Sequence, residues 1–344
     1  MVRSMLEVRE IFRPEITDDI YKSAGIKRPE DCDSTIGIFD GGELLATASI
    51  RDNILVGFAV SSRARGEGLL ATLCTALINI GMSNGHRTFY IFTKPEKAFL
   101  FSACGFREIA RNPPYSALLE WGETSVDQYV QKLRAFSRDK PDGAGCIVMN
   151  ANPFTLGHRY LAEYAAGESR WLYVVVVEAE KSIFPFHVRM ELIQKGLRDL
   201  PNVTVLGGGQ YVISALTFPT YFSKEGDVGP AQTGLDLALF CSYIAPALKV
   251  KRRYVGEEPY CETTRAYNKS MKAALPPRGI EVVEIPRKEK DGEYISASHV
   301  RNLIREGKTE QTKKLLPEST YEFLLTPEGE EIAEKIRHSN DRHG

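Results

Sequence analysis

The chain has 344 residues, of which 43 % are hydrophobic and 26 % are charged, and its formal net charge is −1. This length predicts two domains, and the balanced charge argues against a nucleic-acid partner, because duplex-binding proteins carry a basic excess. The longest apolar run, residues 172–177, is far shorter than the roughly 20 residues that cross a bilayer, so we expect neither a membrane span nor a signal peptide.

The cysteines indicate the redox compartment. All six are widely spaced and none forms a CxxC pair, which argues against a zinc site and against a disulfide framework. We therefore expect reduced thiols in a cytoplasmic protein without a protein-bound metal centre.

The first third of the chain predicts an α+β fold. Short apolar or alternating stretches, separated by turn signals such as Asp40-Gly41-Gly42, are typical of strands. The predicted strands are residues 6–9, 35–39, 44–50, 54–60, 88–92, 106–110 and 116–120, with helices at 69–82 and 95–103. Three early strands joined by tight turns favour an antiparallel sheet over a nucleotide-binding βαβ unit.

A polar segment with helical character follows and ends in the turn Pro141-Asp142-Gly143. We therefore predict a first domain over residues 1–122, a linker helix over 123–142 and a second domain over 143–344.

The second domain alternates strands and helices. The predicted strands are residues 146–149, 172–177, 203–206, 253–255 and 282–285, and the predicted helices are 158–166, 189–198, 235–247, 263–274 and 299–306. Four consecutive valines in the second strand are typical of a parallel strand buried on both faces. The alternation predicts a Rossmann-like parallel sheet and an α/β chain. Residues 207–234 lack periodicity and predict either a substrate-side lid or a plain excursion over the core.

A phosphate-binding turn is predicted between the first strand and the first helix of this sheet. The segment Asn150-Ala151-Asn152-Pro153-Phe154-Thr155-Leu156-Gly157-His158 lies where ligands bind beyond the carboxyl ends of parallel strands. Gly157 allows a phosphate to approach the backbone, and the free N–H groups of the helix start point toward the anion. His158, on the first helical turn, is placed to contact an α-phosphate oxygen.

A second segment, Ile295-Ser296-Ala297-Ser298-His299-Val300-Arg301, begins about 140 residues later. It again places small hydroxyl residues at a helix start, followed by an arginine about one turn further on. Ser298 and Arg301 are expected to bind a triphosphate from the opposite side.

Together the two segments resemble the T/HxGH and ISxSxxR motifs of the nucleotidyltransferase superfamily, which includes nicotinamide-mononucleotide and pantetheine-phosphate adenylyltransferases. Lys181 and Arg189 match the Lys…Arg pattern of the latter enzymes; alternatively, both are solvated surface charges. Gly256 lies in a strand-end loop that the superfamily places near adenine. The resemblance implies that ATP is bound by Asn152, Thr155, Gly157, His158, Arg189, Gly256, Ser296, Ser298 and Arg301.

The chemistry that this resemblance implies is adenylyl transfer from ATP, which depends on alignment and on stabilising developing charge. His158, Lys181 and Arg301 are the expected catalytic residues. Mg²⁺ bridging the phosphates is expected, since no dense carboxylate cage is visible and Mg²⁺ binds largely through phosphates and water.

The first domain contains a glycine loop after the predicted strand 54–60. Its spacing, Arg63-x-x-Gly66-x-Gly68, resembles the pyrophosphate loop of GCN5-related N-acetyltransferases. The resemblance implies that Arg63, Arg65, Gly66 and Gly68 bind a CoA-like group, and the alternative is a surface turn. Phe101 stands where many of these enzymes carry a general-acid tyrosine, which argues against an active acetyltransferase.

The order of the two domains and both second-domain segments resemble the citrate lyase ligase family. The resemblance implies that acetate attacks the α-phosphate of ATP, giving acetyl-adenylate and pyrophosphate. The thiol of a dephospho-CoA-derived prosthetic group on the citrate lyase acyl-carrier subunit then takes the acetyl group and releases AMP. Two alternatives remain open: a bifunctional enzyme that adenylylates a phosphopantetheine-like or mononucleotide substrate and separately acetylates an amine, and a non-catalytic sensor of CoA or nucleotide.

Overall fold

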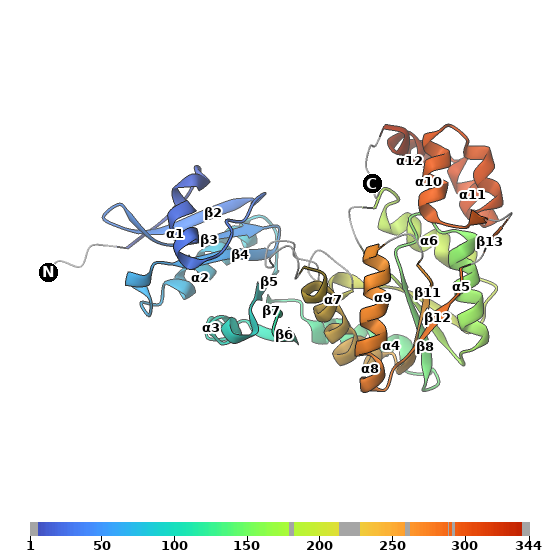
Figure 1. The fold of residues 1–344 in the computed structure, drawn as a ribbon, viewed down its shortest axis with the longest axis horizontal. Helices are drawn as coiled ribbons and strands as arrows, with labels where there is room; N and C mark the ends of the chain where they lie inside the picture. Colours follow the sequence, from blue (N-terminus) through green and yellow to red (C-terminus); the bar gives the residue numbers. More distant parts are fainter. Residues whose placement is uncertain are drawn as a thin grey trace. The chain divides into compact units, whose positions relative to one another are not determined.

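The computed structural model describes residues 6–178, 182–212, 228–258, 262–287, 289–290 and 293–338. The chain divides into two compact units (Figure 1). The first unit holds the residues up to Gln128 together with 228–238, and the second unit holds the chain from Tyr129 onward apart from that segment.

The first unit is built on a seven-stranded sheet with the order β1-β2-β3-β4-β5-β7-β6. Its strands are β1 (Glu7–Glu10), β2 (Ser34–Asp40), β3 (Glu43–Arg51), β4 (Ile54–Val60), β5 (Thr88–Thr93), β6 (Arg107–Asn112) and β7 (Ser116–Gly122). Neighbouring strands are antiparallel except β4 and β5, which are parallel and pair at Ile54–Tyr90 and Leu55–Ile91. The prediction of an α+β sheet is confirmed, with this one parallel pair as a correction.

Helix α2 (Leu69–Ser83) joins the two parallel strands and covers one face of this sheet. Its buried side chains, Leu73 and Leu77 among them, pack in one apolar cluster with the sheet residues Ile36, Ile50 and Phe89. The unit also contains α1 (Asp18–Ala24), which the sequence analysis missed, and α3 (Ala98–Ser102); helix α4 (Val126–Ser137) begins after β7.

The second unit is built on a parallel five-stranded sheet with the order β10-β9-β8-β11-β12. Its strands are β8 (Ala144–Met149), β9 (Leu172–Val176), β10 (Val203–Gly207), β11 (Val250–Gly256) and β12 (Glu281–Ile285). Every residue of β9 is buried, as its valine run predicts for a strand covered on both faces. The predicted parallel sheet is confirmed.

Helices cover this sheet and extend its core. They are α5 (Leu156–Gly167), α6 (Phe186–Gly196), α9 (Glu262–Ala274), α10 (Ala297–Arg305), α11 (Glu318–Leu324) and α12 (Pro327–His338). Figure 1 shows α10, α11 and α12 grouped near α6, and their apolar residues join one core cluster with those of α5 and the sheet. The sequence analysis did not predict α11 or α12.

Residues 228–247 form a helical stretch that begins in the first unit and ends in the second. It consists of α7 (Val228–Leu239), a π-helical turn (Phe240–Ile244) and α8 (Ala245–Ala247), so the helix predicted at 235–247 begins earlier than expected. The predicted irregular segment 207–234 falls largely on residues 213–227, which lie outside the described residues. Within the described part of the chain, no helix combines the length and apolarity needed to cross a bilayer.

Candidate functional site

The predicted phosphate turn joins the carboxyl end of β8 to the first residue of α5. Thr155 caps this helix with extended backbone angles and is buried, and its Oγ1 accepts the His158 N–H at 3.4 Å. In return, the backbone N–H of Thr155 donates to Nδ1 of His158 at 3.1 Å. This reciprocal capping fixes both side chains at the edge of the sheet.

The hydrogen bond from the Thr155 N–H determines which ring nitrogen of His158 carries the proton. Because a backbone N–H can only donate, Nδ1 must be unprotonated, and the neutral ring therefore carries its proton on Nε2. Partial burial, together with the positive charge of Arg287, lowers the pKa of His158 to about 4. The histidine is therefore a neutral Nε2–H donor near pH 7.

Gly157 lies against the second predicted segment. A Cβ placed on Gly157 would stand 2.9 Å from the carbonyl oxygen of Ile295, which is closer than real side chains approach. The Leu156 N–H is taken by the Leu315 carbonyl at 2.9 Å, and the Gly157 N–H has no hydrogen-bond partner among the described residues. One backbone donor at the helix start is thus left for a ligand.

The second segment begins α10, and each of its predicted residues has a distinct position. Ser296 caps the helix by accepting the His299 N–H at 3.1 Å, and Ser298 is exposed on the first turn. Arg301 is buried and donates to the Asn152 carbonyl and, at 3.4 Å, to Ser298 Oγ. Burial lowers the pKa of Arg301. Arg301 therefore ties α10 to the turn after β8, so the structure brings the two distant segments together.

Arg189 has no exposed surface, which excludes a solvated surface charge. Its guanidinium donates to three backbone carbonyls, those of Phe184 (2.9 Å), Asn150 (2.8 Å) and Val177 (2.7 Å). The side chain of Asn152 completes this network by accepting the Phe184 N–H at 3.0 Å. These bonds join the loops that follow β8 and β9, so Arg189 holds the backbone that carries the turn.

The remaining predicted residues of this site are separate from that network. Gly256 ends β11, has open space where a Cβ would stand, and its carbonyl accepts from the Asn268 amide at 3.0 Å. Lys181 lies outside the described residues. The sequence analysis missed Arg287, which follows β12 and pairs with Glu258, because no motif singles out a lone arginine after a strand.

The glycine loop of the first unit is an exposed turn before α2. Gly66 and Gly68 both have positive φ angles, 90° and 76°, and a Cβ on either would meet nothing within 4 Å. Arg63 is exposed and pairs with Glu43 at 3.2 Å, and Arg65 follows on the same turn. The loop thus offers backbone amides and two cations to the solvent.

Phe101 lies inside the apolar core of the first unit. Its ring packs edge-on against Phe58 with a centroid separation of 5.0 Å. A hydrocarbon side chain in this position supplies no proton.

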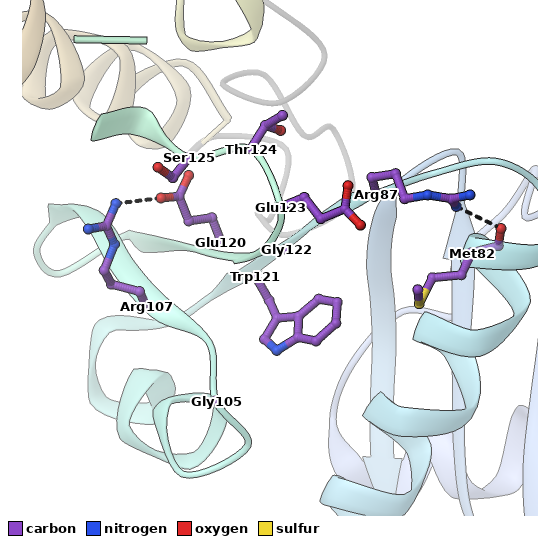
Figure 2. A pocket seen from close by; sticks show the side chains of 10 residues that line it. All are labelled: Met82, Arg87, Gly105, Arg107, Glu120, Trp121, Gly122, Glu123, Thr124 and Ser125. Atoms are coloured by element: carbon purple, nitrogen blue, oxygen red, sulfur yellow. Dashed lines mark hydrogen bonds and ion pairs between the residues drawn. The ribbon is translucent and has the colours of Figure 1, made fainter. Parts of the chain in front are cut away.

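The first unit also has a pocket of about 510 Å³ at the start of β5 and the end of β7 (Figure 2). Trp121 lies at its centre in this view, and Arg107 pairs with the buried carboxylate of Glu120 at 2.6 Å. Glu120 also accepts the Val126 N–H at the start of α4. The negative charge of Glu120 therefore stabilises the beginning of α4.

The fold defines a two-unit α/β protein whose second unit is built on a five-stranded parallel sheet. Residues 144–324 match the family model described as the citrate lyase ligase C-terminal domain. The chain is 39 % identical over 318 residues to the [citrate [pro-3S]-lyase] ligase of Klebsiella pneumoniae, covering 91 % of this chain and 93 % of that one. It is 40 % identical over 304 residues to the Escherichia coli K12 enzyme of the same name, covering 85 % and 86 %. The chain belongs to the citrate lyase ligase family, which confirms the resemblance.

Solved structures resemble single parts of the chain. An N-acetyltransferase from Staphylococcus aureus Mu50 covers 35 % of this chain and 99 % of its own, with 16 % identity and a TM-score of 0.30. Pantothenate synthetase from Thermus thermophilus covers 53 % of this chain and 68 % of its own, with 20 % identity and a TM-score of 0.35.

Proposed function

We propose that this protein acetylates the thiol of the prosthetic group on the citrate lyase acyl-carrier subunit in two ATP-dependent steps. In the first step, a carboxylate oxygen of acetate attacks the α-phosphorus of ATP and displaces pyrophosphate. In the second, the carrier thiol attacks the carbonyl carbon of acetyl-adenylate, loses its proton and releases AMP. Membership of the citrate lyase ligase family supports the substrate, and the Thr155–His158 pair is the structural observation that carries the first step.

His158 is the proposed donor to the α-phosphate. Its Nδ1 is occupied by the Thr155 N–H, so only Nε2–H is left to donate to a phosphate oxygen. The Gly157 N–H, on the same helical turn, is a second donor toward that anion. Donors fixed before the reaction stabilise charge in the transition state without the cost of reorienting them.

Arg301 and Arg189 have different proposed roles, despite their shared charge. Arg301 is adjacent to the exposed Ser298, so it contributes positive charge to the phosphates and links the two segments. Arg189 has no exposed surface, and we assign it to positioning the turn rather than to contact with ATP. Lys181 keeps its predicted role at the phosphates. Mg²⁺, when bound with ATP, would supply charge neutralisation and would be held mainly by phosphate oxygens.

The first unit has a proposed role in the second step. The prosthetic group contains a pyrophosphate arm, and the exposed amides and cations of the Arg63–Gly68 loop suit such an anion. Phe101 disfavours a separate acetyltransferase activity, because it leaves this unit without the expected general acid. The loop is therefore proposed to bind the carrier's prosthetic arm and not to catalyse acetylation of an amine.

Pyrophosphate exchange tests this proposal. Purified protein is incubated with ATP, Mg²⁺ and labelled pyrophosphate, with acetate or with 4′-phosphopantetheine as the acceptor. Label entering ATP only when acetate is present supports acetyl-adenylate formation. Exchange driven only by the phosphorylated acceptor would favour the bifunctional alternative, and no exchange with any carboxylate would favour a non-catalytic sensor.

A further inference from the structure

Arg287 lies at the carboxyl end of the parallel sheet, two residues after β12. One edge of its guanidinium is held, because Nε donates to the Glu257 carbonyl at 2.7 Å and Nη2 binds the Glu258 carboxylate. Both of those residues follow β11, so the pair joins the ends of two neighbouring strands. The side chains of Arg287 and Glu258 are largely buried, with 22 % and 11 % exposed.

The other nitrogen of this guanidinium is available. Nη1 has no hydrogen-bond partner among the described residues, and it carries two N–H groups. An arginine held along one edge has already lost much of its rotamer freedom. A bond from Nη1 to a ligand therefore costs little further side-chain conformational entropy.

Two observations place Arg287 beside the proposed phosphate site. β8, β11 and β12 are parallel neighbours, so Arg287 and the turn after β8 follow strands that end at the same edge of the sheet, and Ile295, eight residues further along the chain, lies directly against Gly157. The positive charge of Arg287 also lowers the pKa of His158. The chain that follows Arg287 therefore reaches the turn in which the Gly157 N–H has no hydrogen-bond partner among the described residues. Both Arg287 and Arg301 carry positive charge at this edge of the sheet, whereas Glu258 offsets only part of it.

We propose that Arg287 is a catalytic residue that binds the β- and γ-phosphates of ATP through Nη1, while Glu258 holds it in place. This inference rests on the proposed function. The two terminal phosphates carry most of the charge of ATP and leave together as pyrophosphate, so a fixed guanidinium there stabilises the leaving group. His158 and Gly157 then hold the α-phosphate at the start of α5.

Calorimetric titration of ATP and of AMP, each in the presence of Mg²⁺, tests this assignment with the full chain. In Arg287→Met, loss of a charge-assisted bond should weaken ATP binding roughly ten- to a hundredfold while AMP binding changes less than about twofold. The matched control is Arg252→Met. Arg252 pairs with Glu281 at 3.0 Å at the opposite ends of the same two strands, and its loss should leave both affinities unchanged.

Thermal unfolding of both variants accompanies the titrations. Unchanged ATP affinity in Arg287→Met, or an equal loss of ATP and AMP binding, would overturn the assignment and make Arg287 a structural link between strand ends. The variant Glu258→Gln should weaken ATP binding less than Arg287→Met does, and a larger loss would also contradict the assignment. Failure of the wild-type protein to bind ATP would instead contradict the proposed function itself.

Discussion

The backbone N–H of Thr155 donates to Nδ1 of His158, and the Thr155 hydroxyl oxygen accepts the backbone N–H of His158. The two hydrogen bonds are reciprocal, so the side chains of Thr155 and His158 are oriented without a ligand. A neutral imidazole with its proton on Nε2 is the consequence, and Nε2 is the ring atom left for chemistry.

Replacing His158 by alanine should abolish acetate-dependent ATP–pyrophosphate exchange. Loss of one preorganised donor to a developing charge typically costs about 10²–10³ in rate. His187→Ala is the control, because His187 is an exposed residue of α6 that pairs with Glu328. Exchange rates and thermal unfolding are measured for both variants. Near-normal exchange in a folded His158→Ala protein would remove His158 from the mechanism.

The stability of the protein should fall between pH 6.5 and pH 4 because of His158. Its folded pKa of about 4 lies below the ordinary value of 6.5, so the unfolded chain binds the proton more tightly in this window. The stability contribution is complete above pH 6.5 and is lost as the pH falls toward 4. It is at most about 3 kcal/mol, and less because the ring is partly exposed.

Urea unfolding of the wild type and of His158→Gln at pH 7 and at pH 5 measures this effect. The variant lacks the titrating ring, so its free energy of unfolding should fall less over this range. If the free energy of unfolding depends on pH in the same way in both proteins, the pKa of the His158 imidazole is not depressed in the folded state.

Gly157→Ala should weaken ATP binding and lower the free energy of unfolding by about 1–3 kcal/mol, because the new methyl group meets the Ile295 carbonyl at 2.9 Å. Gly167→Ala is a matched control at the other end of α5, where a Cβ meets nothing within 4 Å. That control should be neutral or slightly stabilising. Equal behaviour of the two variants in calorimetry and urea unfolding would argue against the close contact of the two segments.

Gly66→Val should impair use of the carrier protein and leave acetate-dependent exchange intact. The side chain strains a backbone at φ 90° and obstructs the loop that is proposed to hold the prosthetic arm. Gly85→Val introduces similar strain at φ 95° just beyond the other end of α2, so it controls for general damage to the first unit. Acetylation of citrate lyase and pyrophosphate exchange are measured side by side. Equal loss of both activities in Gly66→Val would count against the assigned role.

Arg189→Met should lower the free energy of unfolding by roughly 2–5 kcal/mol, since it leaves buried carbonyls without their donor. Because Arg189 is not proposed to contact ATP, any loss of ATP affinity should come only from disorder of the turn after β8. A stable variant that has lost ATP binding would instead indicate direct contact between Arg189 and the nucleotide.

Much of the fold follows from local patterns in the sequence. The valine run of β9 and the alternation of strands with helices identify the parallel sheet, because buried parallel strands are apolar throughout. The parallel pairing of β4 with β5 was missed, since it depends on a crossover through α2 and not on local pattern. Helices α11 and α12 were also missed, although the buried residues Ile332, Ala333 and Ile336 of α12 follow helical spacing.

The part of the candidate site that lies within the two sequence motifs was predictable. The segments around Gly157 and Arg301 meet in the structure, as the resemblance to the two motifs implied, although their roles toward ATP stay predictions. Arg189 shows the limit of such reasoning, because charge alone predicts exposure while the carbonyls that surround it come from three separate loop positions. Arg287 and Glu258 become partners only through the pairing of β11 with β12.

The most direct test uses labelled acetate with deacetylated citrate lyase, ATP, Mg²⁺ and the purified protein. Formation of AMP and of acetyl label on the acyl-carrier subunit is measured together with the activity of the lyase. We expect one AMP for each acetyl group transferred, with no transfer by His158→Ala. Consumption of ATP without acetate, or labelling of the carrier without AMP formation, would contradict an acetyl-adenylate made at the α5 helix start.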